Sequence, residues 1–509
     1  MSRQWMKGWN VCWRSSWTAI AIAAVLSFIT LLQHPMWRDE INVWLIARDS
    51  PSLAALIENI HYDRAHPGLW HLTVAAVQSL FDAPIAMQIW HWLIGLGSLV
   101  LFWRLSRFAL WQKWLFTFGY LPFYEYWVIA RNYGIAMLLL FAICAIWPAR
   151  QRAYWPIAGL VVLLANSNVY ALWMAIALVV TLALEIVGHA KWHDRWLDVG
   201  VSFSAMILGC GVALYFILPP SEVATTALGE SYFYFDWDRL VSTVGRLFGG
   251  YFVVLPNRDR LLDVGVCSLI AIATLILASL QLVKQPYALA FYWSANLLLL
   301  GFTYAKFMPR FIRHFGNYYL VLIAALWLAQ QSYASPLITR RWPQLATWQA
   351  RSRPWFAGLL GVMLVVHLAS GLYRAGFDWA VPYSAGRATA AYIRSADLEY
   401  SIMVGSRDAE LAPLSGYLRQ QIYYPERQAL GSYTLFFQGD RQPVDHAEVL
   451  RQVLTLSSQY ASILLVLTDP LAAAVPELAV DLIKSFERSQ NETYYLYRVQ
   501  LKSPAIPAK

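Results

Sequence analysis

The chain alternates long apolar stretches with short polar connectors over most of its length. A helix needs about 20 predominantly apolar residues to cross the hydrocarbon core of a membrane. Windows of that length predict eleven transmembrane helices, near residues 17–36, 84–103, 113–128, 131–147, 153–167, 168–187, 197–218, 262–283, 286–305, 311–331 and 354–373. Because eleven is odd, the two ends of the chain are expected on opposite sides of the membrane.

Two further apolar stretches, 67–81 and 247–255, are short for a full crossing and contain polar residues or glycines such as His71 and Gly249. Both are predicted to be re-entrant or interfacial helices. If either crossed completely, the count would become twelve or thirteen.

The pattern changes after Phe377, where charge rises and short runs rich in β-branched and aromatic residues appear. These runs predict strands at 402–404, 421–424, 463–467 and 494–497, alternating with helical patterns at 384–396, 410–419, 445–459 and 471–488. Strands that alternate with helices predict a compact α/β domain. We therefore divide the chain into a transmembrane domain, 1–373, with a first outer loop at 37–83, and a C-terminal domain, 374–509.

The composition supports a membrane class, because 59% of the residues are apolar and only 14% are charged, against roughly a quarter charged in soluble proteins. The net charge is +9, but no basic cluster with interleaved aromatic residues indicates a nucleic-acid partner. The four cysteines have no metal-ligand spacing, and none lies in the C-terminal domain.

Basic residues gather in alternate connectors, on the same predicted side as the amino terminus. They are Arg104, Arg107, Lys113, Arg150, Arg152, Lys191, Arg195, Lys284, Arg340, Arg341, Arg351 and Arg353. The positive-inside rule makes that side cytoplasmic. This predicts a multi-pass protein of the plasma (inner) membrane, with loops 37–83 and 219–261 and the C-terminal domain outside the cytoplasm.

Four polar stretches fall on the predicted outer face. They contain Arg38, Asp39 and Glu40; His66, followed by Pro67; Arg131 and Tyr133; and Arg310, Arg313 and His314. Carboxylates beside hydrocarbon are costly unless they are paired, solvated or functional. Arginines in exported segments oppose the insertion bias, and their guanidinium groups match a phosphate well.

Each of these stretches also has a purely structural interpretation. Asp39 and Glu40 could complement the dipole of a loop helix, and His66 could only shape the entry of an interfacial helix. Arg131 could extend from a helix end to the lipid headgroups, and the basic residues between 306 and 314 could form an interfacial anchor. Glu125 is predicted to be solvated at the outer surface.

The order of these features resembles the GT-C membrane glycosyltransferases, especially the protein O-mannosyltransferases and the bacterial transferase that adds aminoarabinose to lipid A. The shared features are one span, an outer loop that opens with Asp39-Glu40, a later His66-Pro67 before an apolar run, and Arg131-x-Tyr133 at an outer helix end. The resemblance covers residues 15–150 and extends more loosely through 310–314. The family more often has His-Pro-Pro where this chain has His66-Pro67-Gly68.

The resemblance implies a transferase that moves a hexosyl or pentosyl group from a polyprenyl-phosphate carrier to an acceptor on the extracytoplasmic face, with inversion. Asp39 would take or orient the acceptor's proton. Arg131, Arg310 and Arg313 would stabilise the departing phosphate. Arg38, Glu40, His66, Tyr133 and His314 complete the expected substrate-binding set, with Glu40 orienting Asp39, binding a sugar hydroxyl or pairing with an arginine.

The acceptor could be a protein, a lipid or a glycan. No cofactor is assigned, although Asp39 and Glu40 could ligate a divalent metal for which no third ligand is evident. Two other functions compete with glycosyl transfer. A transporter or flippase of a lipid-linked or anionic substrate would usually show matched internal repeats, which the sequence lacks. A non-catalytic scaffold predicts a featureless first loop, whereas this loop is polar and distinctive.

Overall fold

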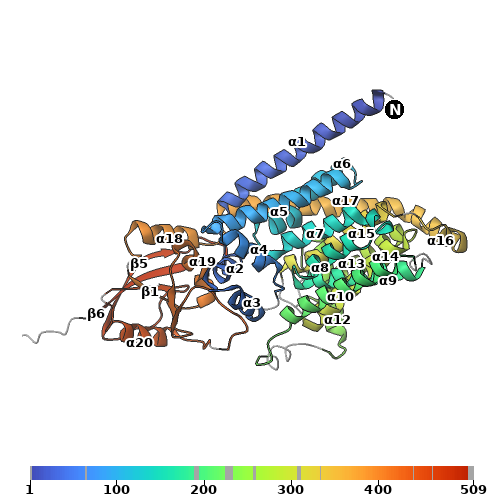
Figure 1. Ribbon diagram of the computed structural model, residues 1–509. Coiled ribbons are helices and arrows are strands. Elements are labelled where there is room, and N and C mark those ends of the chain that lie inside the picture. The colour runs from blue at the N-terminus through green and yellow to red at the C-terminus, as the bar shows by residue number, and fades with distance from the viewer. Residues whose placement is uncertain are drawn as a thin grey trace, which may run out of the picture.

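The structure is a computed structural model of the 509-residue chain. It describes residues 3–63, 66–188, 194–223, 233–255, 260–306, 311–332, 334–399, 401–439, 441–460 and 462–502. A helical bundle forms most of the molecule, and a small sheet domain lies at one end of it (Figure 1). The opposite end of the bundle carries α16 (Pro336–Arg341). The predicted fold class, a polytopic helical bundle followed by a small α/β domain, is confirmed.

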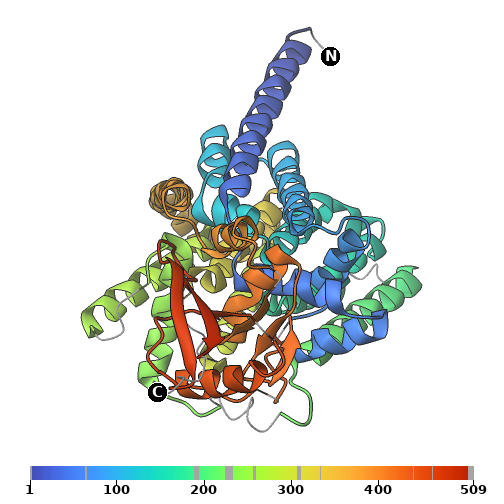
Figure 2. The ribbon, with the colours of Figure 1, turned by 90° about the vertical axis from the view of Figure 1, so that its left-hand side faces the viewer.

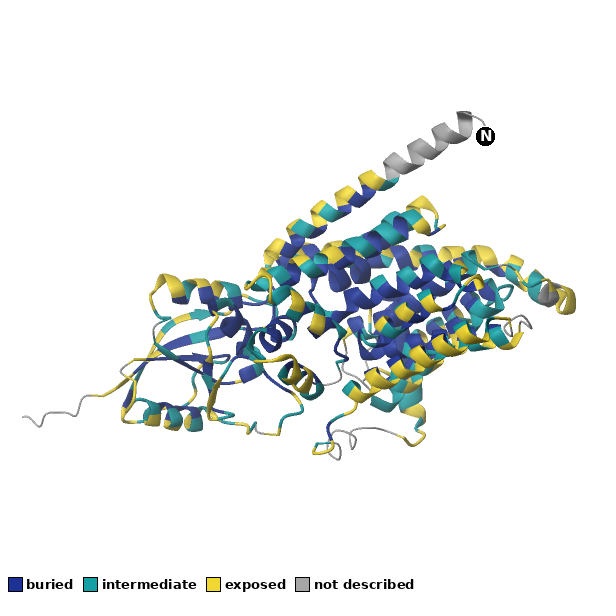
Figure 3. Cartoon of the chain, in the orientation of Figure 1, coloured by how far each residue is buried: buried dark blue, intermediate teal, exposed yellow. Residues whose placement is uncertain are grey.

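Within the described residues, eight helices are long and apolar enough to cross a membrane. They are α1 (Arg3–Gln33), α5 (Pro84–Leu105), α7 (Asn132–Ile146) with the 3-10 turn η2 (Trp147–Gln151), α9 (Val169–Gly188), α10 (Trp196–Ile217), α13 (Leu261–Leu282), α14 (Pro286–Lys306) and α17 (Pro343–Ala380). Apolar residues such as Val201, Ile207 and Leu208 of α10 are exposed. Figure 3 shows that exposed positions follow the outer helices of the bundle, where lipid would cover them.

The remaining predicted crossings take other forms, so the count of eleven is not confirmed. Window 113–128 divides between α6 (Leu110–Thr117) and the π-helix η1 (Tyr120–Val128), and window 153–167 contains α8 (Trp155–Ala165), which has only 11 residues. Helix α15 (Ile312–Gln330) lies inside the bundle, with most of its side chains buried. A sliding window measures apolar content, and it does not detect where a helix breaks or what surrounds it.

Residues 37–83, the predicted first outer loop, contain three short helices, α2 (Arg38–Asp49), α3 (Leu53–Tyr62) and α4 (Leu69–Gln78). With 10 residues, α4 would extend about 15 Å at 1.5 Å per residue. Helix α12 (Trp237–Phe252), with 16 residues, would extend about 24 Å. Both are shorter than the hydrocarbon core of about 30 Å. These lengths agree with the prediction that neither segment crosses fully.

The C-terminal domain has a six-stranded sheet in the order β3-β2-β1-β4-β6-β5. Its strands are β1 (Ile402–Gly405), β2 (Ile422–Tyr424), β3 (Ala429–Gly431), β4 (Ile463–Leu467), β5 (Leu478–Phe486) and β6 (Tyr494–Leu501). Strand β1 runs parallel to both β2 and β4, and the other pairs are antiparallel. Figure 2 shows this domain in front of the bundle.

Helices cover both faces of the sheet. Leu464 and Val466 of β4 pack against α18 (Gly386–Ser395) and α19 (Asp408–Leu418), whereas Leu465 and Leu467 pack against α20 (His446–Leu456). Because successive strand residues point to opposite faces, the apolar run 463–467 serves both cores. The central strand is therefore apolar throughout, as the sequence pattern predicts for a strand buried on both sides.

One predicted element of this domain is wrong. The segment 471–488, expected to be a helix, forms β5, which pairs with β6 at the edge of the sheet. Leu478 and Val480 pack into the core beside α20, whereas Leu482 is exposed and the pairing with β6 shifts register between Leu482 and Lys484. The partner strand supplies the hydrogen bonds that decide between the two structures, and the sequence of β5 alone contains no information about that partner.

The sheet domain is docked on α2, which places it beside the first outer loop. Met36 N–H donates to the Tyr417 hydroxyl at 2.8 Å, and the Asn42 side chain exchanges two hydrogen bonds with the backbone of Thr434, at 3.0 and 2.9 Å. A Cβ on Gly416 of α19 would lie 2.4 Å from Ile41 Cδ1 of α2, so only glycine permits this approach without displacement. The two domains therefore form a continuous packed boundary at α2.

Candidate active site

A cavity of about 230 Å³ lies where the first outer loop meets the bundle and the sheet domain. Its wall consists of Arg38, Asp39, Asn42, Val43, Asp63, His66, Trp70, His71, Arg131, Asn132, Ala409 and Phe436. Helices α2 and α4, the start of α7 and the sheet domain all contribute. Four of the residues predicted from the sequence, Arg38, Asp39, His66 and Arg131, thus lie around one cavity.

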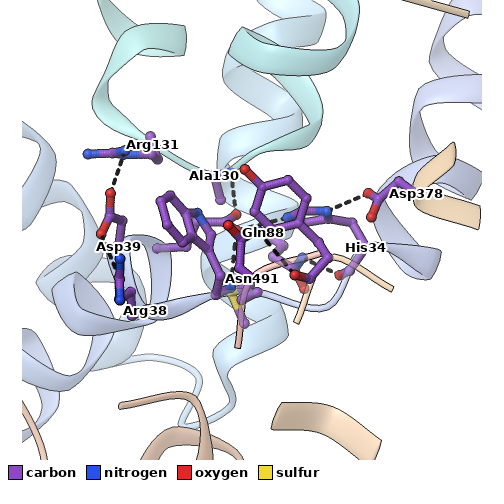
Figure 4. A network of polar contacts seen from close by, with 12 residues as sticks. His34, Arg38, Asp39, Gln88, Ala130, Arg131, Asp378 and Asn491 are labelled. Atoms are coloured by element: carbon purple, nitrogen blue, oxygen red, sulfur yellow. Dashed lines mark hydrogen bonds and ion pairs between the residues drawn. The ribbon is translucent and has the colours of Figure 1, made fainter. Parts of the chain in front are cut away.

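Asp39 is in the first turn of α2, with 25% of its side chain exposed. Its Oδ2 accepts hydrogen bonds from Arg131 Nη1 at 2.8 Å and from Arg313 Nη2 at 3.4 Å. Its Oδ1 lies 3.8 Å from Arg38 Nε (Figure 4). One carboxylate thus meets three guanidinium groups, and the oxygen with the longer contact is the one that is freer to bind a ligand.

Arg131 and Arg313 are held from behind by aromatic rings. Both guanidinium groups lie over the Trp37 ring, with centroid distances of 6.0 and 5.2 Å. Their side chains are only 11% and 8% exposed, so Coulomb interactions are screened less there than at a free surface. Arg313 Nε is buried without a hydrogen-bond partner among the described residues, which leaves a donor for a bound anion.

Arg313 also lies 4.0 Å from Glu125 Oε1. Glu125 is 4% exposed, and it accepts a hydrogen bond from the Tyr120 hydroxyl at 2.5 Å. The prediction that Glu125 is solvated at the outer surface is therefore wrong. Glu125 belongs to η1, which packs against α15 and α17. The sequence around Glu125 does not show that these helices bury it.

Glu40, adjacent to Asp39 in sequence, points away from the cavity and is 0% exposed. Its Oε1 accepts from Ala130 N–H at 2.6 Å, and its Oε2 accepts from His34 Nε2 at 2.8 Å. No arginine pairs with it among the described residues, and it has no free surface for a sugar hydroxyl. Of the three predicted roles, the geometry fits only the orientation of the Asp39 surroundings.

His34 lies between two carboxylates, since its Nδ1 donates to Asp378 Oδ2 at 2.6 Å (Figure 4). Burial lowers the pKa of His34, but the charges and hydrogen bonds of Glu40 and Asp378 outweigh burial and raise the pKa to about 10. The imidazole is therefore a buried cation at neutral pH. It joins the end of α1, the start of α2 and the end of α17.

His66 lies at the rim of the cavity, with its Nδ1 3.2 Å from Asp63 Oδ2. His71 Nε2 lies 3.0 Å from the same oxygen. Burial alone would raise the pKa of Asp63, but the two histidines outweigh it and hold that pKa well below its usual range. Asp63 therefore orients both imidazole rings. The sequence does not show this role, because it does not show that His66 and His71 meet at the same carboxylate.

The other predicted residues are not in the cavity wall. Tyr133 stacks on Tyr126 behind Arg131, with ring centroids 5.3 Å apart, and His314 stacks on Tyr170 at 5.3 Å. They form an aromatic layer beneath the arginines. Arg310 lies outside the described residues.

Several residues of the site come from the C-terminal domain and were not identified from the sequence. Glu410 pairs with Arg38 at 3.0 Å, Ala409 and Phe436 line the cavity, and Glu492 accepts a hydrogen bond from Arg38 N–H at 3.2 Å. Burial raises the pKa of Glu492 to about 7, although Ser384 and Arg38 partly oppose the shift. These residues are hundreds of positions away from Asp39 in the chain, and no local pattern connects them.

The geometry does not fit the predicted option of a metal on Asp39 and Glu40, because the two carboxylates point in different directions. Among the described residues, no group of three or more histidine, cysteine or acidic side chains is arranged to hold a metal ion. The charge of Asp39 is instead balanced by arginines, and an anionic ligand could take the place of the Asp39 carboxylate on their guanidinium groups.

The fold and the membrane-length helices define a multi-pass membrane protein, with a small α/β domain at one end. The chain is similar in structure to ArnT from Cupriavidus metallidurans in the apo state, with a TM-score of 0.53 over 97% of this chain and 98% of that chain. The sequence identity is 14%, so the similarity establishes the shared fold. No protein-family model matches the sequence, and no curated protein sequence matches it significantly.

Proposed function

We propose that this protein is a glycosyltransferase of the plasma membrane that moves a sugar from a polyprenyl-phosphate carrier to an acceptor. ArnT, whose fold the chain shares, is a lipid A aminoarabinose transferase of the GT-C superfamily. The observation that carries the proposal is one accessible carboxylate, Asp39, in a cavity at the domain boundary, where it pairs with Arg131 of the cavity wall and with the buried Arg313. This arrangement supplies a proton acceptor and an anion site side by side.

In the proposed reaction, the acceptor's hydroxyl oxygen attacks the anomeric carbon of the donor sugar. The bond from that carbon to the phosphate oxygen breaks, and the phosphate keeps the electron pair. The hydroxyl proton passes to Asp39, and attack in line with the departing phosphate inverts the configuration. Arg131 and Arg313 stabilise the charge that develops on the phosphate, where a low local dielectric strengthens the interaction.

The ion pairs of Asp39 imply that the donor binds before Asp39 accepts a proton. While Arg131 and Arg313 bind Asp39 Oδ2, that oxygen is occupied by the two guanidinium groups and is not free to accept the hydrogen of a hydroxyl group. A phosphate that enters the cavity competes for both guanidinium groups, because bidentate contacts to phosphate are strong. Donor binding would thereby free Asp39 to accept a proton only when the sugar is in place.

The proposal includes a sidedness. We propose that the amino terminus is cytoplasmic and that residues 37–83 and the C-terminal domain are extracytoplasmic, where the donor sugar would be presented. Ser458→Cys, at an exposed position in the sheet domain, should react with a membrane-impermeant maleimide in intact cells. Gln344→Cys, exposed near the basic helix α16, should react only after permeabilisation. If Gln344→Cys reacted in intact cells and Ser458→Cys only after permeabilisation, Asp39 would lie on the opposite side of the membrane from the proposed substrates, and the proposal would fail.

The central test is Asp39→Asn in detergent-purified protein. The assay measures release of polyprenyl phosphate from lipid-linked sugars extracted from the producing cells, with cell-envelope extract as acceptor. Loss of a general base typically lowers the rate by about 10²–10⁴-fold. Asp82→Asn, which removes an exposed carboxylate near the end of the same loop, is the matched control and should keep wild-type turnover. An Asp39→Asn variant that turns over at the wild-type rate would exclude the proposed base.

A further inference from the structure

A second, larger cavity of about 900 Å³ lies in the C-terminal domain, at the carboxyl ends of β1 and β4. The chain leaves β1 into α19 on one face of the sheet, whereas α20, which precedes β4, covers the other face. In open α/β sheets, ligands bind in the crevice outside the carboxyl ends of parallel strands, at the point where the connections diverge to opposite faces. This cavity occupies that position.

The wall of the crevice is built from paired charges. Arg441 donates to the buried Asp408 carboxylate at 2.8 and 2.5 Å, and Arg407 forms an ion pair with Asp469. Asp469 is 49% exposed, so this part of the crevice is open to solvent. Salt-bridged guanidinium and carboxylate groups retain free donors and acceptors at their edges, and these can bind several hydroxyl groups at once.

Glu426, in the wall of the crevice, has hydrogen-bond partners for only one of its two carboxylate oxygens among the described residues. Its Oε1 accepts from the Ser406 hydroxyl at 2.8 Å and from Arg407 N–H at 2.5 Å. Its Oε2 is buried and has no hydrogen-bond partner among the described residues. Burial raises the pKa of Glu426. A buried polar oxygen at the wall of a cavity requires a partner, and a ligand can provide one.

The backbone at the end of β1 is also unusual. Arg407 has φ of 66° and ψ of 63°, in the left-handed region that non-glycine residues rarely adopt. This conformation aims Arg407 N–H at Glu426 and starts α19 from the edge of the crevice. Residues held in this region concentrate at binding and active sites, where the surrounding structure fixes them.

The charge of the wall indicates which ligands fit. Three arginines line the crevice, Arg38, Arg407 and Arg441, against five acidic residues, Asp408, Glu410, Glu426, Asp445 and Asp469. The formal excess of carboxylates disfavours a phosphorylated or otherwise anionic ligand. An uncharged molecule with many hydroxyl groups can donate to the carboxylates and accept from the arginines, as a carbohydrate does.

The crevice adjoins the Asp39 cavity, because Arg38 and Ala409 line both. Cavities that bind small molecules are typically about 300–1,000 Å³. The Asp39 cavity, at about 230 Å³, is below this range, whereas the crevice is within it. A ligand longer than one sugar would therefore extend from Asp39 past Arg38 into the crevice, and the contact between α2 and α19 fixes the distance between the two sites.

We propose that the crevice at the ends of β1 and β4 binds the uncharged, hydroxyl-rich carbohydrate portion of the acceptor. The hydroxyl group that attacks the donor then reaches Asp39 past Arg38 and Ala409. This assignment rests on the proposed glycosyl transfer, and it names the acceptor as a glycan.

The test measures glycan binding without donor, so that its result is independent of catalysis by Asp39. Oligosaccharides released from the envelope of producing cells are separated by anion exchange into an uncharged and an anionic fraction. Saturation-transfer NMR then detects binding of each fraction to the full-length protein in detergent. We expect signals from the uncharged fraction that fall at least fivefold in Glu426→Gln and in Asp469→Asn.

Two controls separate the possible causes of a lost signal. Asp481→Asn removes an exposed carboxylate on β5, away from the crevice, and should bind like the wild type. The assay contains no donor, so failure of the proposed catalysis by Asp39 would leave this result intact. Gln at position 426 preserves the acceptor for Ser406 and Arg407, and an unchanged melting temperature shows that the domain is folded. Binding of the anionic fraction alone, no binding of either fraction, or equal binding in Glu426→Gln would overturn the proposal.

Discussion

Removing the charge of Glu40 tests the buried network that supports the candidate site. Glu40→Gln keeps the shape of the side chain, but it leaves the His34 cation with one carboxylate partner, Asp378, instead of two. It also weakens the acceptor of Ala130 N–H, at the turn before Arg131. Breaking a buried ion pair by removing one partner costs about 3–5 kcal/mol. A cost near the lower end is expected, because glutamine can still accept one hydrogen bond.

The pH dependence gives a second, independent measure of the same network. The folded pKa of His34, about 10, is above its unfolded value of 6.5. The stability that His34 protonation contributes is therefore fully present below pH 6.5 and is lost as pH rises toward 10, with a slope of up to about 1.4 kcal/mol per pH unit. In Glu40→Gln the pKa of His34 is lower, so the slope between pH 7 and 9 should become smaller.

The assay is the free energy of unfolding in mixed micelles, measured by titration with a denaturing detergent at pH 7 and pH 9. Glu58→Gln, an exposed position on α3, is the control and should match the wild type at both pH values. If Glu40→Gln unfolded with the same free energy as the wild type and the same pH slope, the assignment of His34 as a buried cation between two carboxylates would be refuted.

Three further predictions follow from individual contacts. Arg131→Ala should raise the KM for the lipid-linked donor more than the KM for the acceptor, because it removes the proposed contact to the donor phosphate; equal changes in both would contradict the donor role. Because burial raises the folded pKa of Glu492 to about 7, above its unfolded value of 4.5, the stability from its protonation is present below pH 4.5 and lost as pH rises through 7. Glu492→Gln should flatten the stability profile of the protein between pH 5 and 8, and an unaltered profile would argue against this titration. Gly416→Ala should cost about 1–3 kcal/mol by overpacking against Ile41, whereas Gly376→Ala, with no atom within 4 Å of the added Cβ, should be neutral or stabilising in the same unfolding assay.

The amount of structure that the sequence predicts depends on whether the signal is local. Strand β4, predicted at 463–467, and the first half of β6, predicted at 494–497, are recognisable because runs of apolar and aromatic residues indicate burial in a sheet. The helices α18, α19 and α20 lie close to their predicted bounds, and α18 and α20 have clear apolar periodicity. Strand β5 was mistaken for a helix because an edge strand takes its hydrogen bonds from a partner elsewhere in the chain.

The same distinction applies to the candidate site. We predicted that charged residues gather at one membrane face, because Asp39 follows the first span and arginines lie at later helix ends. The structure brings Asp39, Arg131 and Arg313 together. The sequence did not predict that Glu40 points in the opposite direction to its neighbour. On a helix, adjacent residues differ in direction by about 100°, so one can face a cavity while the other faces the core.

The sequence by itself determined the membrane class and the α/β character of the C-terminal domain, because hydrophobic length and periodicity are properties of neighbouring positions. Tertiary structure alone decided the burial of Glu125, the cation between Glu40 and Asp378, and the crevice that Arg38 shares with the sheet domain. These features depend on residues up to hundreds of positions apart, and the energy of a buried charge is set by whichever groups packing brings next to it.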